Sequence, residues 1–166
     1  MNFDNFDRAG HPLGQRFFGK YEGVVTDVND PLEIGRLRAR VPEIFGVDME
    51  CGWALPCAPF GGGKDRGMLF LPEVGDTVWI EFAAGDLSRP IWAGAFWGAP
   101  ESAGQQEDLA SETGSELPTS EGARAAAGVS ILRTKAGHRI VMNDNDELVI
   151  FAHGGDQAEI RLTRQG

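Results

Sequence analysis

Apolar and polar residues alternate with a period of two through most of this chain, and stretches of helical period are scarce. This alternation predicts strands rather than helices. The predicted strands span residues 17–28, 34–41, 51–60, 77–83 and 88–98, with a further short strand beginning at Met68. Gly19 and Gly23 lie inside the first strand and predict a bulge or a sharp coil of the sheet there.

Five strands with coiled members and no substantial helix match the size of a small closed barrel over residues 17–98. The oligonucleotide/oligosaccharide-binding (OB) type is the natural match, so the predicted fold class is all-β. Seven aromatic residues are expected in the core or on the rims of the barrel: Trp53, Phe70, Trp79, Phe82, Trp92, Phe96 and Trp97. The segment GGGKDRG, from Gly61 to Gly67, predicts a mobile loop that contacts a neighbour, since the Walker spacing is absent.

Three arginines occupy one face of the predicted strand 34–41, and its small and apolar residues occupy the other face. An outward row of Arg36, Arg38 and Arg40 fits either a solvated face or a docking patch for an acidic partner. Both interpretations stay open on the sequence alone.

Two segments break the period-two pattern. Residues 1–16 are polar without a period and predict an N-terminal arm. Residues 99–128 carry six acidic residues against one arginine and have almost nothing to bury. This second segment therefore predicts an acidic, flexible linker extended by its own charge.

From Val129 the alternation returns in four pieces separated by short turn sequences. A tail over residues 129–166 is too small to bury its own apolar side chains as an independent unit. We therefore predict an oligomerisation element, in which strands from several chains wrap around one axis. The predicted interface residues are Ile131, Leu132, Ile140, Met142, Leu148, Ile150, Phe151, Ile160 and Leu162.

Charge and composition narrow the function classes. The formal net charge is −10 and the sequence pI is about 4.7, so nucleic acid and anionic membrane surfaces are poor partners. No window approaches the length of a transmembrane helix. Cys51 and Cys57 do not form a redox or zinc pattern, and we expect two buried thiols rather than a disulfide between them.

Candidate catalytic and metal-binding residues are sparse. His138 has no partner at ligand spacing and is expected at a turn edge, whereas His153 could join its own copies around an axis to hold a metal. The run NDND from Asn143 lacks calcium-loop spacing and predicts a turn. No serine or cysteine triad can be assembled. We therefore expect no enzyme activity, no cofactor and no metal.

Several motifs together resemble a known family. The stretches GKYEGVVTDVNDPLEIGRLRARVPEIFG, CGWALPCAPFGG and LPEVGDTVWIEFAAGDLSRPIWAGAFWG resemble the OB domain of contractile-tail spike proteins. That family includes phage baseplate assembly protein V, the phage central spike and the valine-glycine repeat spike of type VI secretion. The stretch ILRTKAGHRIVMNDNDE is similar to the segment that opens the trimeric β-helix of these proteins.

The resemblance implies a homotrimer whose OB domains meet a separate hub-ring protein, among other baseplate proteins. The tails would intertwine into a short trimeric β-helix or β-prism, capped by a PAAR-repeat tip protein. The implied function is that of a structural spike joining the hub to a membrane-piercing tip. Its place would be the baseplate of a virion or injection particle assembled in the bacterial cytoplasm. The alternatives are an OB-fold module for single-stranded nucleic acid or carbohydrate, and a cell-wall hydrolase.

Overall fold

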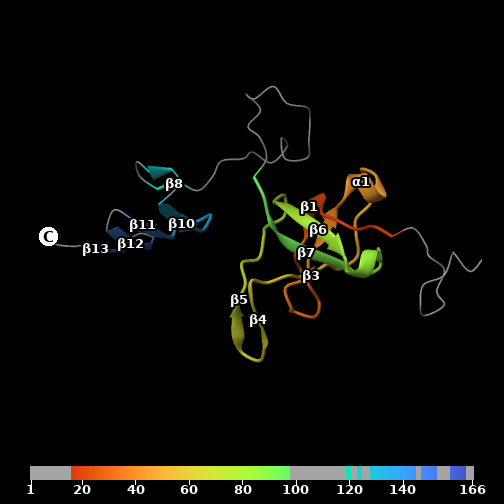
Figure 1. Cartoon of the computed structure of the whole chain (residues 1–166), viewed down its shortest axis with the longest axis horizontal. Coiled ribbons are helices and arrows are strands. Elements are labelled where there is room, and N and C mark those ends of the chain that lie inside the picture. Colours follow the sequence, from red (N-terminus) through yellow and green to blue (C-terminus); the bar gives the residue numbers. More distant parts are fainter. Residues whose placement is uncertain are drawn as a thin grey trace, which may run out of the picture. The chain divides into compact units, whose positions relative to one another are not determined.

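The structure is a computed structural model that describes residues 16–97, 119–120, 123–124, 128–144, 147–152 and 158–163. The chain divides into two compact units, Met1–Ser115 and Glu116–Gly166 (Figure 1). Strands dominate both, and the helices of the described residues are one turn over Pro42–Phe45 (α1) and a 3-10 turn over Ala83–Gly85. None of these helices is long and apolar enough to cross a membrane. The predicted all-β fold class is confirmed.

Unit 1 is built on one curled five-stranded sheet. Its order is β2–β1–β6–β7–β3, with β1 at Tyr21–Asp27, β2 at Arg38–Arg40, β3 at Leu55–Pro56, β6 at Thr77–Phe82 and β7 at Pro90–Ala95. Neighbouring strands are antiparallel except for β3 and β7. Leu37 and Ala54 exchange backbone hydrogen bonds of 3.2 and 2.8 Å beside the two outer strands. This bridge joins the sheet edges, as a small OB barrel requires.

The barrel core follows the predicted alternation. Leu37, Ala39 and Val41 are fully buried, whereas the arginines between and beside them are half-buried. Val25, Val78 and Ile80 complete the centre of the core. Of the seven aromatic residues, Phe82 and Trp92 are core residues, Trp53, Trp79 and Phe96 are half-buried, and Phe70 and Trp97 are exposed.

The helix α1 closes one side of this core. Phe45 packs edge-on against Phe82, with ring centroids 6.1 Å apart. Pro42 is its first residue, where the missing N–H of proline costs no helical hydrogen bond. The turn thereby supplies apolar side chains to a barrel whose strands are short.

Two details of unit 1 differ from the predictions. The segment GGGKDRG is not a loop but part of a hairpin, β4 (Phe60–Gly63) and β5 (Arg66–Met68). Its two-residue turn is tight, and Asp65 adopts a left-handed φ of 54° that Asp tolerates. The predicted strand 51–60 is reduced to β3, because its prolines interrupt strand pairing.

The two cysteines also differ from each other. Both are free thiols and Cys51 is buried, as predicted, but the prediction that Cys57 is buried is wrong. Cys57 directly follows β3, and its backbone N–H donates a hydrogen bond to the Trp92 carbonyl at 2.8 Å, whereas its thiol is exposed.

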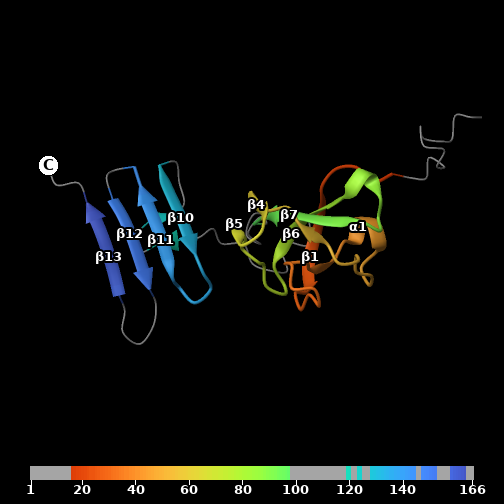
Figure 2. The ribbon, with the colours of Figure 1, turned by 90° about the horizontal axis from the view of Figure 1, so that it is seen from below.

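Unit 2 is a four-stranded antiparallel sheet in chain order (Figure 2). Its strands are β10 (Val129–Arg133), β11 (Arg139–Asn143), β12 (Glu147–Ala152) and β13 (Ala158–Thr163), which confirms the four predicted strands. A small hairpin, β8 (Thr119–Ser120) and β9 (Ala123–Arg124), falls in the range predicted as linker. The predicted arm up to residue 15, and the predicted linker from 99 to 118, lie outside the described residues.

Candidate interaction surfaces

The loop between β1 and β2 is fixed by one buried ion pair. Asp30 accepts hydrogen bonds from the Arg36 guanidinium at 2.6 and 2.9 Å and from the backbone N–H groups of Leu32, Ile34 and Arg36. The side chains of Asp30 and Arg36 are only 4% and 17% exposed. The guanidinium therefore holds the pKa of Asp30 well below its usual range.

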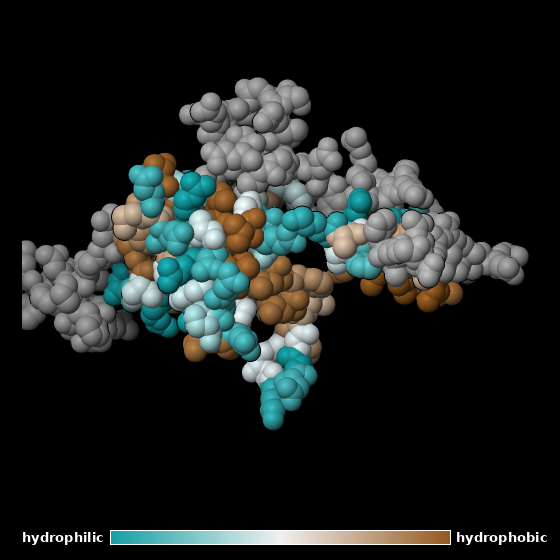
Figure 3. Space-filling model, turned by 180° about the vertical axis from the view of Figure 1, so that it is seen from behind, coloured by the Kyte–Doolittle hydropathy of each residue, from teal (hydrophilic) through white to brown (hydrophobic). Residues whose placement is uncertain are grey.

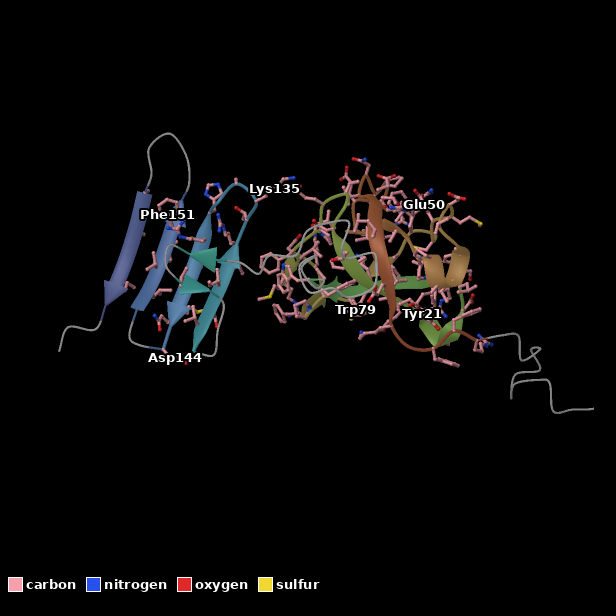
Figure 4. The ribbon with its side chains drawn as sticks, turned by 90° about the horizontal axis from the view of Figure 1, so that it is seen from above. Tyr21, Glu50, Trp79, Lys135, Asp144 and Phe151 are labelled. Atoms are coloured by element: carbon pink, nitrogen blue, oxygen red, sulfur yellow. The ribbon has the colours of Figure 1, made fainter. Side chains whose placement is uncertain are left out.

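Arg36 and Arg38 also contact the Trp53 ring. The guanidinium groups of Arg36 and Arg38 lie 5.4 and 4.8 Å from the centroid of the Trp53 ring. Arg38 also lies 3.8 Å from Glu50, which Figure 4 shows near α1. Arg36 is thus an internal anchor, and Arg38 and Arg40 are half-buried. The docking role of the three arginines stays a prediction, and the Arg36 side chain is less accessible than that of Arg38.

A second surface surrounds the base of the β4–β5 hairpin. The exposed apolar residues there, which we call the hairpin patch, are Phe60, Met68, Leu69, Phe70 and Leu71. Phe60 pairs with Met68 across the hairpin, and Leu69 lies against Gly35, where an added Cβ would be 3.0 Å from a Leu69 methyl group. Figure 3 shows hydrophobic residues gathered beside this hairpin, whose tip is hydrophilic. Such a contiguous apolar surface is typical of a protein contact.

The third surface is one face of the unit 2 sheet. Strand register aligns two apolar rows on it, Leu132–Ile140–Ile150–Ile160 and Met142–Leu148–Leu162. We call these seven residues the tail face. All but Leu148 are between 37 and 59% exposed. Figure 3 shows hydrophobic residues along this side of the sheet, and Figure 1 shows β8 on the other side.

The opposite face of the same sheet is different. Val141 and Val149 are buried there, and the Arg139 guanidinium lies 4.0 Å from the centroid of the Phe151 ring. Ile131 shares this face, since it pairs with Val141. The nine predicted interface residues therefore divide, with seven on the tail face and Ile131 and Phe151 behind it. Their role in an interface stays a prediction.

The described residues contain no group of three or more His, Cys, Asp or Glu side chains placed to hold a metal. His138 lies at the turn between β10 and β11, where its carbonyl accepts a hydrogen bond from the Thr134 N–H at 2.9 Å. Asp144 begins the turn predicted at NDND, and Asn145, Asp146 and His153 lie outside the described residues. Lys135 and Asp144 lie at opposite ends of the sheet (Figure 4).

Most of unit 1 is similar to a domain of a known family. Residues 21–97 match the family model of the type VI secretion system/phage-baseplate injector OB domain. This part of the chain is therefore similar to an injector OB domain. The match begins with β1 and ends at Trp97, so the injector OB domain includes Trp53, its arginines and the hairpin patch. Unit 2 lies outside the match, and a comparison with curated proteins finds none that matches the chain.

Proposed function

We propose that this protein is a trimeric central spike of a contractile injection machine, with a structural rather than enzymatic role. The injector OB domain supports a place in the baseplate of a phage tail or injection particle. The tail face is the observation that carries the proposal. Three tails would bury these faces against one another in a short needle, for which the register supports a β-prism of three sheets.

The size of the tail face explains why a single chain is unfavourable. Six of its large apolar side chains are roughly half exposed. Full burial of such a side chain contributes about 1.5–3 kcal/mol, so each stands to gain on the order of 1 kcal/mol by association. These side chains form a flat surface of two rows, and such a surface is suited to packing against another sheet.

The injector OB domain would dock the spike onto its neighbours. In this proposal the hairpin patch packs on the hub ring, and Arg38 and Arg40 face acidic groups of the same partner. A PAAR-repeat protein would cap the needle. The particle would be assembled in the bacterial cytoplasm, and other baseplate proteins would surround the spike.

The competing function, binding of single-stranded nucleic acid, has weaker support. Such binding relies on open aromatic rings in a basic groove. Two guanidinium groups already lie over the Trp53 ring, and the net charge of the chain is −10. A filter-binding assay with oligonucleotides should detect no salt-sensitive affinity.

Two adjacent positions of β11 provide the test. Met142 lies on the tail face and Asn143 on the opposite face. We expect Met142→Lys to convert the trimer to monomer, because three lysines would be buried near one axis, whereas Asn143→Lys should leave the trimer intact. Light scattering coupled to size exclusion measures both masses. A monomeric unsubstituted protein at micromolar concentration would exclude the spike assignment.

A further inference from the structure

The two arginines that contact the Trp53 ring differ in how fully their own chain satisfies them. Arg36 is paired with the carboxylate of Asp30 at 2.6 and 2.9 Å, and its side chain is only 17% exposed. The carboxylate beside Arg38 is that of Glu50, at 3.8 Å, which is outside hydrogen-bond range. The side chains of this second pair are 42% and 41% exposed, and so open an ion pair contributes little to stability. Arg36 therefore serves the fold, whereas Arg38 is available for a contact outside the chain.

The pairing of β1 with β2 explains why Arg38 keeps this unused capacity. Asp27 faces Arg38 across the two strands, but its Oδ1 accepts hydrogen bonds from the backbone N–H and the side-chain amide of Asn29. The Nε atom of Arg38 is buried, and within the described residues it donates no hydrogen bond. The Trp53 ring lies 4.8 Å from the guanidinium and holds it by a cation–π contact. Arg38 is thus fixed in position while its donors are not saturated.

We infer that Arg38, held against Trp53, binds an aspartate or glutamate side chain of a partner protein, and that Glu50 lies beside the same donors until the partner docks. This inference rests on the docking role proposed for Arg38 and Arg40 and specifies its chemistry. A guanidinium presents its N–H groups in a planar fork, so a carboxylate that approaches head-on can accept two parallel hydrogen bonds. Glu50, at 3.8 Å, makes neither of them.

The surroundings favour a carboxylate on a protein over the phosphates of a nucleic acid. Asp27 and Glu50 both lie beside Arg38, and the net charge of the chain is −10. A phosphate backbone brings many charges and would be repelled, whereas one carboxylate brings a single charge that one guanidinium can balance. Arginine and tryptophan side chains are also the ones whose truncation most often weakens a protein interface strongly. Arg38 and Trp53 together therefore fit the anchor of a protein contact.

A titration followed by NMR tests the inference on the full, ¹⁵N-labelled chain. The probe is glutamate capped at both its amino and its carboxyl end, and capped glutamine is the neutral comparison. The indole N–H signal of Trp53, assigned with Trp53→Phe, reports on the adjacent guanidinium. Capped glutamate should shift this signal, and capped glutamine should not. The initial slope of the shift against probe concentration then gives the relative affinity of each variant.

Two substitutions should change that slope in opposite directions. Arg38→Lys keeps the charge but loses the planar fork, so the affinity should fall about tenfold, as expected for losing a hydrogen bond to a charged group. Glu50→Gln removes the competing carboxylate, so the affinity should rise about two- to fivefold, the range of an exposed ion pair. Arg66→Lys on β5 and Glu43→Gln on α1 are matched controls at exposed sites and should leave the slope unchanged.

Each contrary result is decisive. A slope for Arg38→Lys equal to that of the unsubstituted chain would overturn the inference, and so would a Glu50→Gln slope no steeper than that of Glu43→Gln. Equal responses to capped glutamate and capped glutamine would overturn it as well. None of these results concerns the tail face, so the spike proposal would stand. A monomeric unsubstituted chain in light scattering would instead overturn the spike proposal and leave the measured carboxylate site in place.

Discussion

At the residue scale, Asp30 is the side chain that organises the loop leading into β2. One carboxylate accepts from three backbone N–H groups and one guanidinium. The loop needs this support because Glu33 and Gly35 both adopt left-handed φ angles, of 52° and 79°. Strand alternation predicts that Arg36 shares one face with Arg38 and Arg40. It could not predict the ion pair between Arg36 and Asp30.

We expect Asp30→Asn to lower the melting temperature of unit 1 by several degrees at pH 7, because it leaves the Arg36 guanidinium without a counter-charge. Since the pKa of Asp30 is depressed in the folded state, its contribution is present above about pH 4, the ordinary value for an aspartate, and declines as the pH falls. The difference from the unsubstituted protein should therefore shrink between pH 7 and pH 3 in thermal melts. Asp48→Asn, at an exposed site, is the control. An equal difference at both pH values would contradict the assigned role.

At the element scale, close packing across the barrel explains why position 23 is a glycine, for which the sequence alone offered more than one reason. Gly23 was expected to mark a bulge or a sharp coil of the sheet, and the register shift between β1 and β2 lies between Val25 and Asp27. A Cβ at Gly23 would instead meet Ile80 at 3.0 Å and Ala39 at 3.3 Å. Glycine is therefore required at this position for packing across the barrel.

Gly23→Ala should lower the free energy of unfolding by about 1–3 kcal/mol, the usual cost of an added methyl group in a filled core. Gly52→Ala is a matched control, because a Cβ at Gly52 meets nothing within 4 Å. Urea unfolding followed by tryptophan fluorescence measures both variants. A Gly23→Ala protein as stable as the control would mean that Ile80 moves aside at no cost.

The sequence predicts features that depend on residues close together in the chain, and it misses features that depend on contacts between distant segments. Period-two alternation depends on neighbours in the chain, so it correctly placed β1, β6, β7 and the four tail strands. The contact of Leu37 with Ala54 and the Asp30–Arg36 pair depend on how distant segments meet. Adjacent residues of a strand point to opposite faces, so the sequence alone shows that Ile131 and Leu132 cannot share one surface. The pairing register of β10 with β11 was needed to decide which of the two lies on the tail face.

At the scale of the whole molecule, the two units differ in how many apolar side chains each buries. Unit 1 encloses a buried core of its own, including Leu37, Val78 and Ile80. The described part of unit 2 is the four-stranded sheet and the small hairpin β8–β9, and its buried apolar residues are Val141 and Val149. A unit with its own core can fold alone, whereas a lone sheet with an apolar face depends on association.

This contrast predicts how the full chain unfolds. Since association stabilises an oligomer by mass action, the transition of the tail should move to higher temperature as protein concentration rises. The transition of the barrel should not move, and it should persist in a chain truncated after Gly128. Calorimetry at two concentrations, with light scattering on the truncated chain, separates the two units. A truncated chain that is still trimeric would place the trimer contact in unit 1, and the tail face would then need another occupant.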